Sequence, residues 1–88
     1  RKDPQEAENQ MITVKFYGLL RIDSGIREMQ IEAASLKSLY NEITRLCPSV
    51  EREALKRSIV LINGQRAHPS SKLSEGDTVQ FLSPSAGG

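Results

Sequence analysis

Apolar and polar residues alternate from Ile12 to Tyr17, in the order Ile-Thr-Val-Lys-Phe-Tyr. Strict alternation among residues of high β-propensity predicts a strand that turns one face toward a core. The apolar face would carry Ile12, Val14 and Phe16, and the opposite face would carry Thr13, Lys15 and Tyr17. The pattern therefore places a half-buried strand near the start of the chain.

A second, weaker alternation over Ile26–Ile31 predicts a partner strand, with Met29 and Ile31 on one face. The residues from Leu19 to Gly25 are expected to form a connection, because Asp23-Ser-Gly25 is typical of a turn. The two strands would then form a hairpin.

The middle of the chain has helical periodicity. One apolar stripe is formed by Leu36, Leu39, Tyr40, Ile43, Leu46 and Cys47. Ser35 is a suitable N-cap, because its hydroxyl can accept a bond from a free backbone N–H of the first turn. Pro48 is expected to end the helix, since the residue before a proline is pushed out of helical dihedral angles. The segment Val50–Lys56 is a candidate for a short second helix around Leu55.

The last third of the chain reads as short strands joined by turns. A strand is expected over Ser58–Ile62, and Asn63-Gly64 directly after it is a strong signal for a tight hairpin turn. A short returning segment, Gln65–His68, would follow. The turn at Glu75–Asp77 precedes the last predicted strand, Thr78–Leu82.

This order of elements predicts an α+β fold. A hairpin, a helix that crosses over the sheet, and then further strands give a mixed sheet with one main helix on one face, which is the β-grasp (ubiquitin-like) arrangement. The crossover makes the first and last strands parallel neighbours.

A single helix covers only one face of such a sheet. The opposite face would carry Tyr17 and Leu82, and it would also carry one of two pairs of residues: Val60 and Ile62, or Ile59 and Leu61. Apolar residues on an open face near the end of the chain are a candidate docking patch for a partner protein. The alternative is that they are the scattered apolar residues that any small domain exposes.

Length and charge exclude several classes of function. The 88 residues make one domain, and we expect a domain at 11–82 between an arm at 1–10, disordered or an expression remnant, and a flexible tail at 83–88. A net charge of +1 argues against nucleic acid as a partner, and no apolar run is long enough for a membrane helix.

Cysteine and histidine content argues against catalysis and metal binding. Cys47 cannot form an internal disulfide, and with His68 as the only histidine no metal-ligand cluster arises. We expect Cys47 to be buried on the helix stripe. Neither a nucleophile–base pair nor a phosphate-binding loop is visible, so no bound cofactor and no catalytic machinery are expected. A reducing, cytoplasmic setting fits this composition.

The sequence ends in Ser-Ala-Gly-Gly, and no charged side chain follows Asp77. A terminal glycine pair contributes nothing to a core, because glycine loses the most conformational entropy on ordering. It does present a carboxylate without a nearby Cβ, which can enter a narrow channel in another protein. Gly88 is thus a candidate for activation, with Gly87 and Ala86 leading it into the channel.

Three features of the chain from Met11 onward form a distinctive set: Val14-Lys-Phe-Tyr17 followed by Leu20-Arg21 and Gly25, Leu73-x-Glu-Gly-Asp-x-Val79, and the terminal Ala-Gly-Gly. With these features the chain resembles the MoaD/ThiS family of ubiquitin-like sulfur carriers. Its length and first loop resemble MoaD, the small subunit of molybdopterin synthase, more than the shorter ThiS.

The resemblance implies a carrier function for the tail. A ubiquitin-activating-type (MoeB-like) enzyme would use ATP to adenylate the Gly88 carboxylate, and a sulfur donor protein would convert the adenylate to a thiocarboxylate. The tail would then enter a MoaE-like large subunit and pass its sulfur to the pterin precursor. The resemblance also places Tyr17, Arg21 and Leu82 at positions where the family contacts its partners.

Two positions depart from the usual MoaD pattern. Ser85 stands where the tail usually has an apolar residue, and the segment Leu20–Gly25 lacks a common Arg-Glu pair. Three alternatives therefore stay open: a carrier for another pathway, such as thiamine or tungsten-cofactor synthesis, a modifier conjugated to lysines through Gly88, and a module that binds without covalent chemistry.

Overall fold

The computed structural model describes residues 10–68 and 70–83. In chain order the elements are β1 (Gln10–Tyr17), α2 (Leu19–Ser24), β2 (Glu28–Ala33), α3 (Leu36–Leu46), α4 (Arg52–Arg57), β3 (Ile59–Ile62), β4 (Gln65–Arg66) and β5 (Thr78–Leu82). The sheet has the strand order β2-β1-β5-β3-β4. Strands β1 and β5 are parallel, and the other neighbouring pairs are antiparallel. This confirms the predicted mixed sheet with parallel first and last strands.

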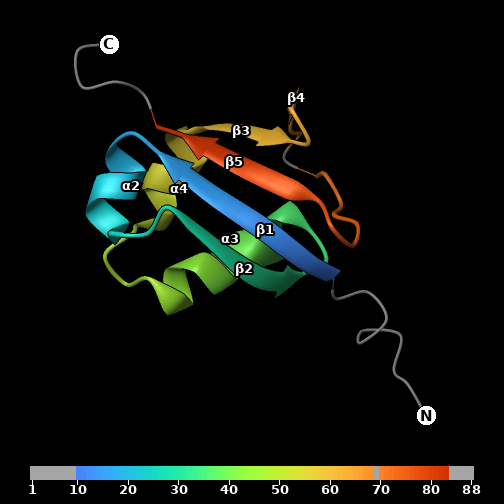
Figure 1. The fold of residues 1–88 in the computed structure, drawn as a ribbon, viewed down its shortest axis with the longest axis horizontal. Helices are drawn as coiled ribbons and strands as arrows, with labels where there is room; N and C mark the ends of the chain where they lie inside the picture. The colour runs from blue at the N-terminus through green and yellow to red at the C-terminus, as the bar shows by residue number, and fades with distance from the viewer. Residues whose placement is uncertain (1–9, 69, 84–88) are drawn as a thin grey trace.

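The helices α3 and α4 lie behind the sheet in the view of Figure 1, so the described residues form a sheet layer and a helical layer. The core lies between these layers. Its largest fully buried side chains are Phe16, Phe81, Ile12, Leu20, Leu39, Ile43, Leu55, Val14 and Val79. The predicted alternation on β1 is confirmed, because Ile12, Val14 and Phe16 are all completely buried.

Helix α3 begins as the sequence predicts. The Ser35 hydroxyl accepts a bond from the backbone N–H of Ser38, and the Ser38 hydroxyl accepts one from the backbone N–H of Ser35. This reciprocal pair satisfies two N–H groups that have no partner within the helix. Leu46 differs from the prediction, because it is 46% exposed although it belongs to the apolar stripe. Cys47 is buried, as predicted.

The segment predicted as a connection after β1 is instead helix α2. Gly25 has φ 72° and its N–H bonds the carbonyl of Arg21, so it closes the helix in the left-handed conformation that glycine favours. Leu20 is 2% exposed and holds the helix on the core. The Asp23-Ser-Gly25 signal therefore marks the end of a helix, not the turn of a hairpin.

Strand β2 lies two residues later than the predicted range Ile26–Ile31. The backbone N–H of Ile26 donates to the Ser24 hydroxyl at 3.0 Å, and that hydroxyl donates to the Ile26 carbonyl at 3.3 Å. This local bonding holds Ile26 in the turn that leaves α2 and delays the start of the strand.

The hairpin at Asn63-Gly64 is confirmed. Both residues have positive φ, 52° and 86°, as the tight turn between right-handed twisted strands requires. The returning strand β4 has two residues, fewer than the predicted Gln65–His68. Ala67 extends the contact, because its N–H donates to the carbonyl of Val60 at 2.8 Å.

The turn before β5 is tied to both sides of the sheet. The Asp77 carboxylate accepts bonds from the Ser74 N–H and the Asn63 side chain, each at 2.8 Å. Asn63 in turn accepts a bond from the Thr78 N–H. At the other side, the N–H of Gly76 donates to the carbonyl of Met11 at 3.0 Å. This turn therefore aligns β5 with β1 and with the β3–β4 hairpin.

We predict that Asp77→Ala lowers the free energy of unfolding by about 1–3 kcal/mol, because two donors lose a charged acceptor. Chemical denaturation of the purified variant measures this loss. The control is Asp23→Ala at an exposed position of α2, where a change within about 0.5 kcal/mol is expected. Equal stability of the two variants would contradict the linking role of Asp77.

Candidate functional site

The three tail residues predicted to react or to thread, Gly88, Gly87 and Ala86, lie outside the described residues, as does Ser85. The described chain reaches Ser83, directly after β5. The geometry of the site is therefore the geometry of the surface from which the tail starts.

Ser83 joins the start of the tail to the junction between β1 and α2. Its hydroxyl accepts a bond from the Leu19 N–H at 2.7 Å and donates to the Tyr17 carbonyl at 3.1 Å. The polypeptide thus leaves the sheet from a point held by two hydrogen bonds to residues more than sixty positions earlier in the sequence.

Gly18 makes this close approach possible. It has φ 68°, and a Cβ at this position would lie 2.5 Å from the Ser83 hydroxyl oxygen. Carbon and oxygen do not approach so closely without a bond, so any side chain would displace Ser83. The conformation and the contact both require glycine.

An apolar row lies next to the start of the tail. Tyr17 is in register with Leu82 across β1 and β5, and Leu82 is in register with Ile59 across β5 and β3. These side chains point away from the core, since their neighbours Phe16, Phe81 and Val60 are buried. Among the described elements, none covers this face of the sheet (Figure 1). We name Tyr17, Leu82 and Ile59 the apolar row.

The face is mostly polar in the next row away from the tail. This row contains Gln80, Lys15 and Glu28 in register, with the apolar Leu61 at its β3 end. The Gln80 side chain donates to the Tyr17 hydroxyl at 3.1 Å, which fixes the orientation of the ring. An apolar strip beside polar groups is the pattern of a protein-binding surface with a core and a rim.

The structure decides between the two pairs that the sequence left open on β3. Val60 is 8% exposed and belongs to the core, and Ile62 packs against it. Ile59 is 43% exposed and extends the apolar row. The sequence could not make this choice, because β3 is apolar at all four positions and has no alternation to follow.

Arg21 lies on α2, which Figure 1 shows beside the ends of β1 and β5. Arg21 is exposed, and it belongs to this helix, whereas the residues of the apolar row belong to strands β1, β5 and β3. The same helix exposes two apolar residues that sequence reasoning missed, Leu19 at 45% and Ile22 at 73%. Leu19 is bonded through its N–H to Ser83, so it adjoins the start of the tail. Recognising α2 as a helix would have drawn attention to both residues.

Titratable groups in the described part of the chain do not assemble a reactive centre. No group of three or more acidic, histidine or cysteine side chains there could hold a metal ion. Burial raises the pKa of the Cys47 thiol, which disfavours the reactive thiolate. The His68 ring contacts the Ser70 hydroxyl at 2.8 Å in an exposed loop. In the residues described, no helix is both long and apolar enough to span a bilayer.

The sequence model of the ThiS family matches residues 14–88, which include the second half of strand β1, the turn before β5 and the C-terminal Ala-Gly-Gly. The chain belongs to the ThiS family. It is therefore a member of the ubiquitin-like sulfur carriers, ThiS and MoaD among them. No curated protein sequence matches this chain significantly.

Solved structures share the fold. The small archaeal modifier protein 1 from Methanosarcina acetivorans has a TM-score of 0.80 at 18% identity, over 91% of this chain and 98% of its own. A putative molybdopterin converting factor subunit 1 from Pyrococcus furiosus has a TM-score of 0.68 at 22% identity, over 85% and 98%. These likenesses confirm the predicted β-grasp fold.

A third similar structure is a complex. It is the protein–protein complex of subunits 1 and 2 of molybdopterin-converting factor from Helicobacter pylori. The likeness has a TM-score of 0.66 at 25% identity and covers 90% of this chain and the whole of the other.

We predict that Gly18→Ala is more destabilising than Gly25→Ala. Both glycines have positive φ, which costs a substituted residue about 1–3 kcal/mol, but the space around Gly25 is open within 4 Å. Denaturant unfolding of both variants measures the difference.

The double variant Gly18→Ala/Ser83→Gly isolates the contact, because it removes the Ser83 hydroxyl that the new Cβ would meet. Part of the loss in Gly18→Ala should be recovered there. No coupling between the two positions would show that Gly18 serves only its own backbone conformation.

Proposed function

We propose that this protein is the MoaD-like small subunit of a molybdopterin synthase, and that the Gly88 carboxylate carries the sulfur as a thiocarboxylate. The observation that supports this most directly is the apolar row on an uncovered sheet face, directly beside the point where the Gly-Gly tail starts. A carrier needs these two features together, a surface for docking and a reactive end within reach of it.

The chemistry requires activation of the tail by another protein. A carboxylate is a poor electrophile, so one of its oxygens first attacks the α-phosphate of ATP and pyrophosphate leaves. The outer sulfur of a persulfide on the donor protein then attacks the carbonyl carbon, and AMP departs with the electrons of the broken C–O bond. A second thiol of the donor attacks the inner sulfur of the resulting acyl disulfide, so the donor is left with a disulfide and Gly88 carries one sulfur in place of one oxygen. No step uses a side chain of the described domain as an acid, base or nucleophile.

The length of the C-terminal tail allows docking and reaction to occur at different places on a partner protein. The six residues from Ser83 to Gly88 can span at most about 20 Å when fully extended. The carboxyl group can therefore enter an active site in a partner while the apolar row rests on that partner's surface. The two bonds of Ser83 set the starting point of this reach.

We propose that the same apolar row meets two partners in turn, a MoeB-like activating enzyme and a MoaE-like large subunit. The likeness to one component of the Helicobacter pylori complex of converting-factor subunits 1 and 2 supports the second partner. A single patch shared by both would make the two complexes mutually exclusive, so the carrier would leave one partner before it joins the other.

A second candidate function is conjugation to proteins. The likeness to small archaeal modifier protein 1 favours it, with a TM-score of 0.80. In that case a lysine amine would attack the activated Gly88 carbonyl and form an isopeptide bond. A carrier for thiamine or another sulfur pathway would share the thiocarboxylate and differ only in the acceptor.

The first experiment is intact mass measurement after incubation with host lysate, ATP and a sulfur donor. We expect a shift that matches exchange of one oxygen for one sulfur at Gly88. A variant with one alanine added after Gly88 should not shift, because the reactive carboxylate is displaced from the activating site. The matched control carries the extra alanine at the N-terminus and should shift normally.

Slower-migrating adducts without sulfur exchange would favour the protein modifier. If neither product forms in a lysate that thiocarboxylates a known carrier, the result would favour a module that binds its partners without covalent chemistry. Sulfur exchange on the C-terminally extended variant would refute the assignment of Gly88 as the reacting residue.

The docking surface has its own test. Leu82→Asp should weaken binding to the activating enzyme by about tenfold or more, because it buries an unpaired charge in the centre of the contact. Isothermal titration calorimetry measures the affinity, and circular dichroism checks the fold. The control is Leu46→Asp, which makes the same change at an exposed leucine on the helical layer. Equal affinity of the two variants would place the docking surface elsewhere.

A further inference from the structure

A second surface feature lies on the helical side of the molecule, away from the apolar row. A cavity of about 470 Å³ opens between α3, α4 and the strands β3 and β4. This volume is within the range of sites that hold a ligand or a bound side chain. The proposed sulfur transfer makes no use of it.

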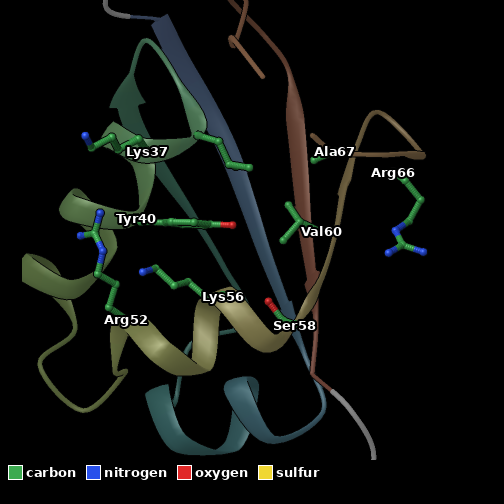
Figure 2. Close-up of a pocket in the computed structure, with 9 residues that line it drawn as sticks. Lys37, Tyr40, Arg52, Lys56, Ser58, Val60, Arg66 and Ala67 are labelled. Carbon is green, nitrogen blue, oxygen red and sulfur yellow. The ribbon is translucent and has the colours of Figure 1, made fainter. Parts of the chain in front are cut away.

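The floor of this cavity is largely apolar. Leu36, Tyr40, Val60 and Ala67 contribute to its lining. Figure 2 shows the Tyr40 ring lying across the cavity with its hydroxyl directed toward Val60. The ring packs against the buried ring of Phe81, and the two ring centroids are 5.9 Å apart. Such a floor can accept an apolar side chain without rearrangement.

The rim of the cavity is strongly basic. It contains Lys37, Arg52, Lys56 and Arg66, and none of the lining residues is acidic. Among the described residues, no ion pair joins any of these four cations to a carboxylate, since the pair recorded there is between Arg45 and Glu42. The protein has twelve lysine and arginine residues and eleven acidic residues, and a third of its cations line this cavity with no ion-pair partner in the part of the chain that the structure describes.

Tyr40 adds no negative charge to this site. Burial raises the pKa of its phenol, and the nearby Arg52 lowers it by a smaller amount. The usual pKa of tyrosine is already about 10, so the group is neutral at pH 7. Arg52 also donates to the side-chain carbonyl of Asn41, which holds its guanidinium beside the cavity without neutralising it.

The placement of the cations distinguishes a peptide from a small anion. In Figure 2, Lys37 lies on one side of the Tyr40 ring, Arg52 and Lys56 lie on the other, and Arg66 lies beyond Val60 on the strand side. A single phosphate group would need cations that converge on one point. Cations spread around an apolar floor instead match an extended segment with several carboxylates on both sides of one apolar residue.

We infer that this cavity binds an acidic peptide segment of a partner protein, with one large apolar side chain on the Tyr40 floor and carboxylates at Lys37, Arg52, Lys56 and Arg66. The segment would bind on the helical layer, and the apolar row on the sheet would stay accessible. A protein that carries such a segment could therefore hold this chain while the tail is engaged elsewhere. This inference does not depend on the sulfur chemistry of Gly88.

The test uses the full chain and a dye-labelled synthetic peptide with one leucine between three acidic residues on each side. We expect saturable binding in fluorescence polarisation that weakens as salt is added, because opposite charges are screened. Amide chemical shifts of the unmodified, isotope-labelled protein should change around Tyr40, Arg52 and Ala67. Absence of shifts there at peptide concentrations up to about 1 mM would overturn the proposal.

Matched variants separate this cavity from general charge attraction. Lys56→Glu should weaken peptide binding roughly fivefold or more, since an attraction becomes a repulsion. Arg57→Glu makes the same change in net charge on the same helix, at an exposed residue outside the cavity lining, and should have a much smaller effect. Equal losses in the two variants would show non-specific attraction and refute the site.

Two further probes test the chemistry of the occupant. A peptide with glycine in place of leucine should bind several-fold more weakly, because it leaves the apolar floor empty. Inorganic phosphate should not reproduce the peptide's chemical shift changes. The same changes at lower phosphate concentration would overturn the proposal in favour of a small-anion site.

Discussion

The parallel pairing of β1 with β5 is the constraint on which the rest of the structure depends. It joins the first and last strands of the domain at the centre of the sheet, with Val14 opposite Val79 and Phe16 opposite Phe81. All four side chains are completely buried, and burial of each contributes about 1.5–3 kcal/mol. The same register places Tyr17 beside Leu82 on the outer face. One pairing thus builds both the core and the proposed docking surface.

Because side chains alternate along β1 and β5, the two faces of the sheet have different functions. Inward residues hold α3 and α4, and outward residues leave an apolar row at the end of the sheet from which the tail departs. The turn at Ser74–Asp77 and the bonds of Ser83 secure the two ends of β5. The proposed carrier function needs this rigidity, because the reactive end can be positioned only as well as the strand that delivers it.

The helical layer provides a separate surface. Its cavity combines the Tyr40 floor with cations from α3, α4 and the edge of the sheet, residues far apart in the sequence. The sequence shows these lysines and arginines only as scattered charges, for which solvation is the ordinary expectation. Their arrangement around one cavity depends on the angle at which α4 and the β3–β4 hairpin meet α3. No periodicity within a single element reports such an angle.

The sequence by itself determined the fold class, most of the elements and the family. Clear periodicity predicted β1, α3 and β5, and Asn63-Gly64 predicted the hairpin, because these signals depend on local sterics and on which face is buried. Only the tertiary structure decided that 19–24 is a helix, since burial of Leu20 stabilises six residues whose local signal is a turn. It also decided that Ile59 faces outward, because a strand apolar at every position takes its orientation from its neighbour β5. Sequence patterns predict structure where neighbouring residues determine it, and they fail where contacts with distant parts of the chain determine a residue's conformation and burial.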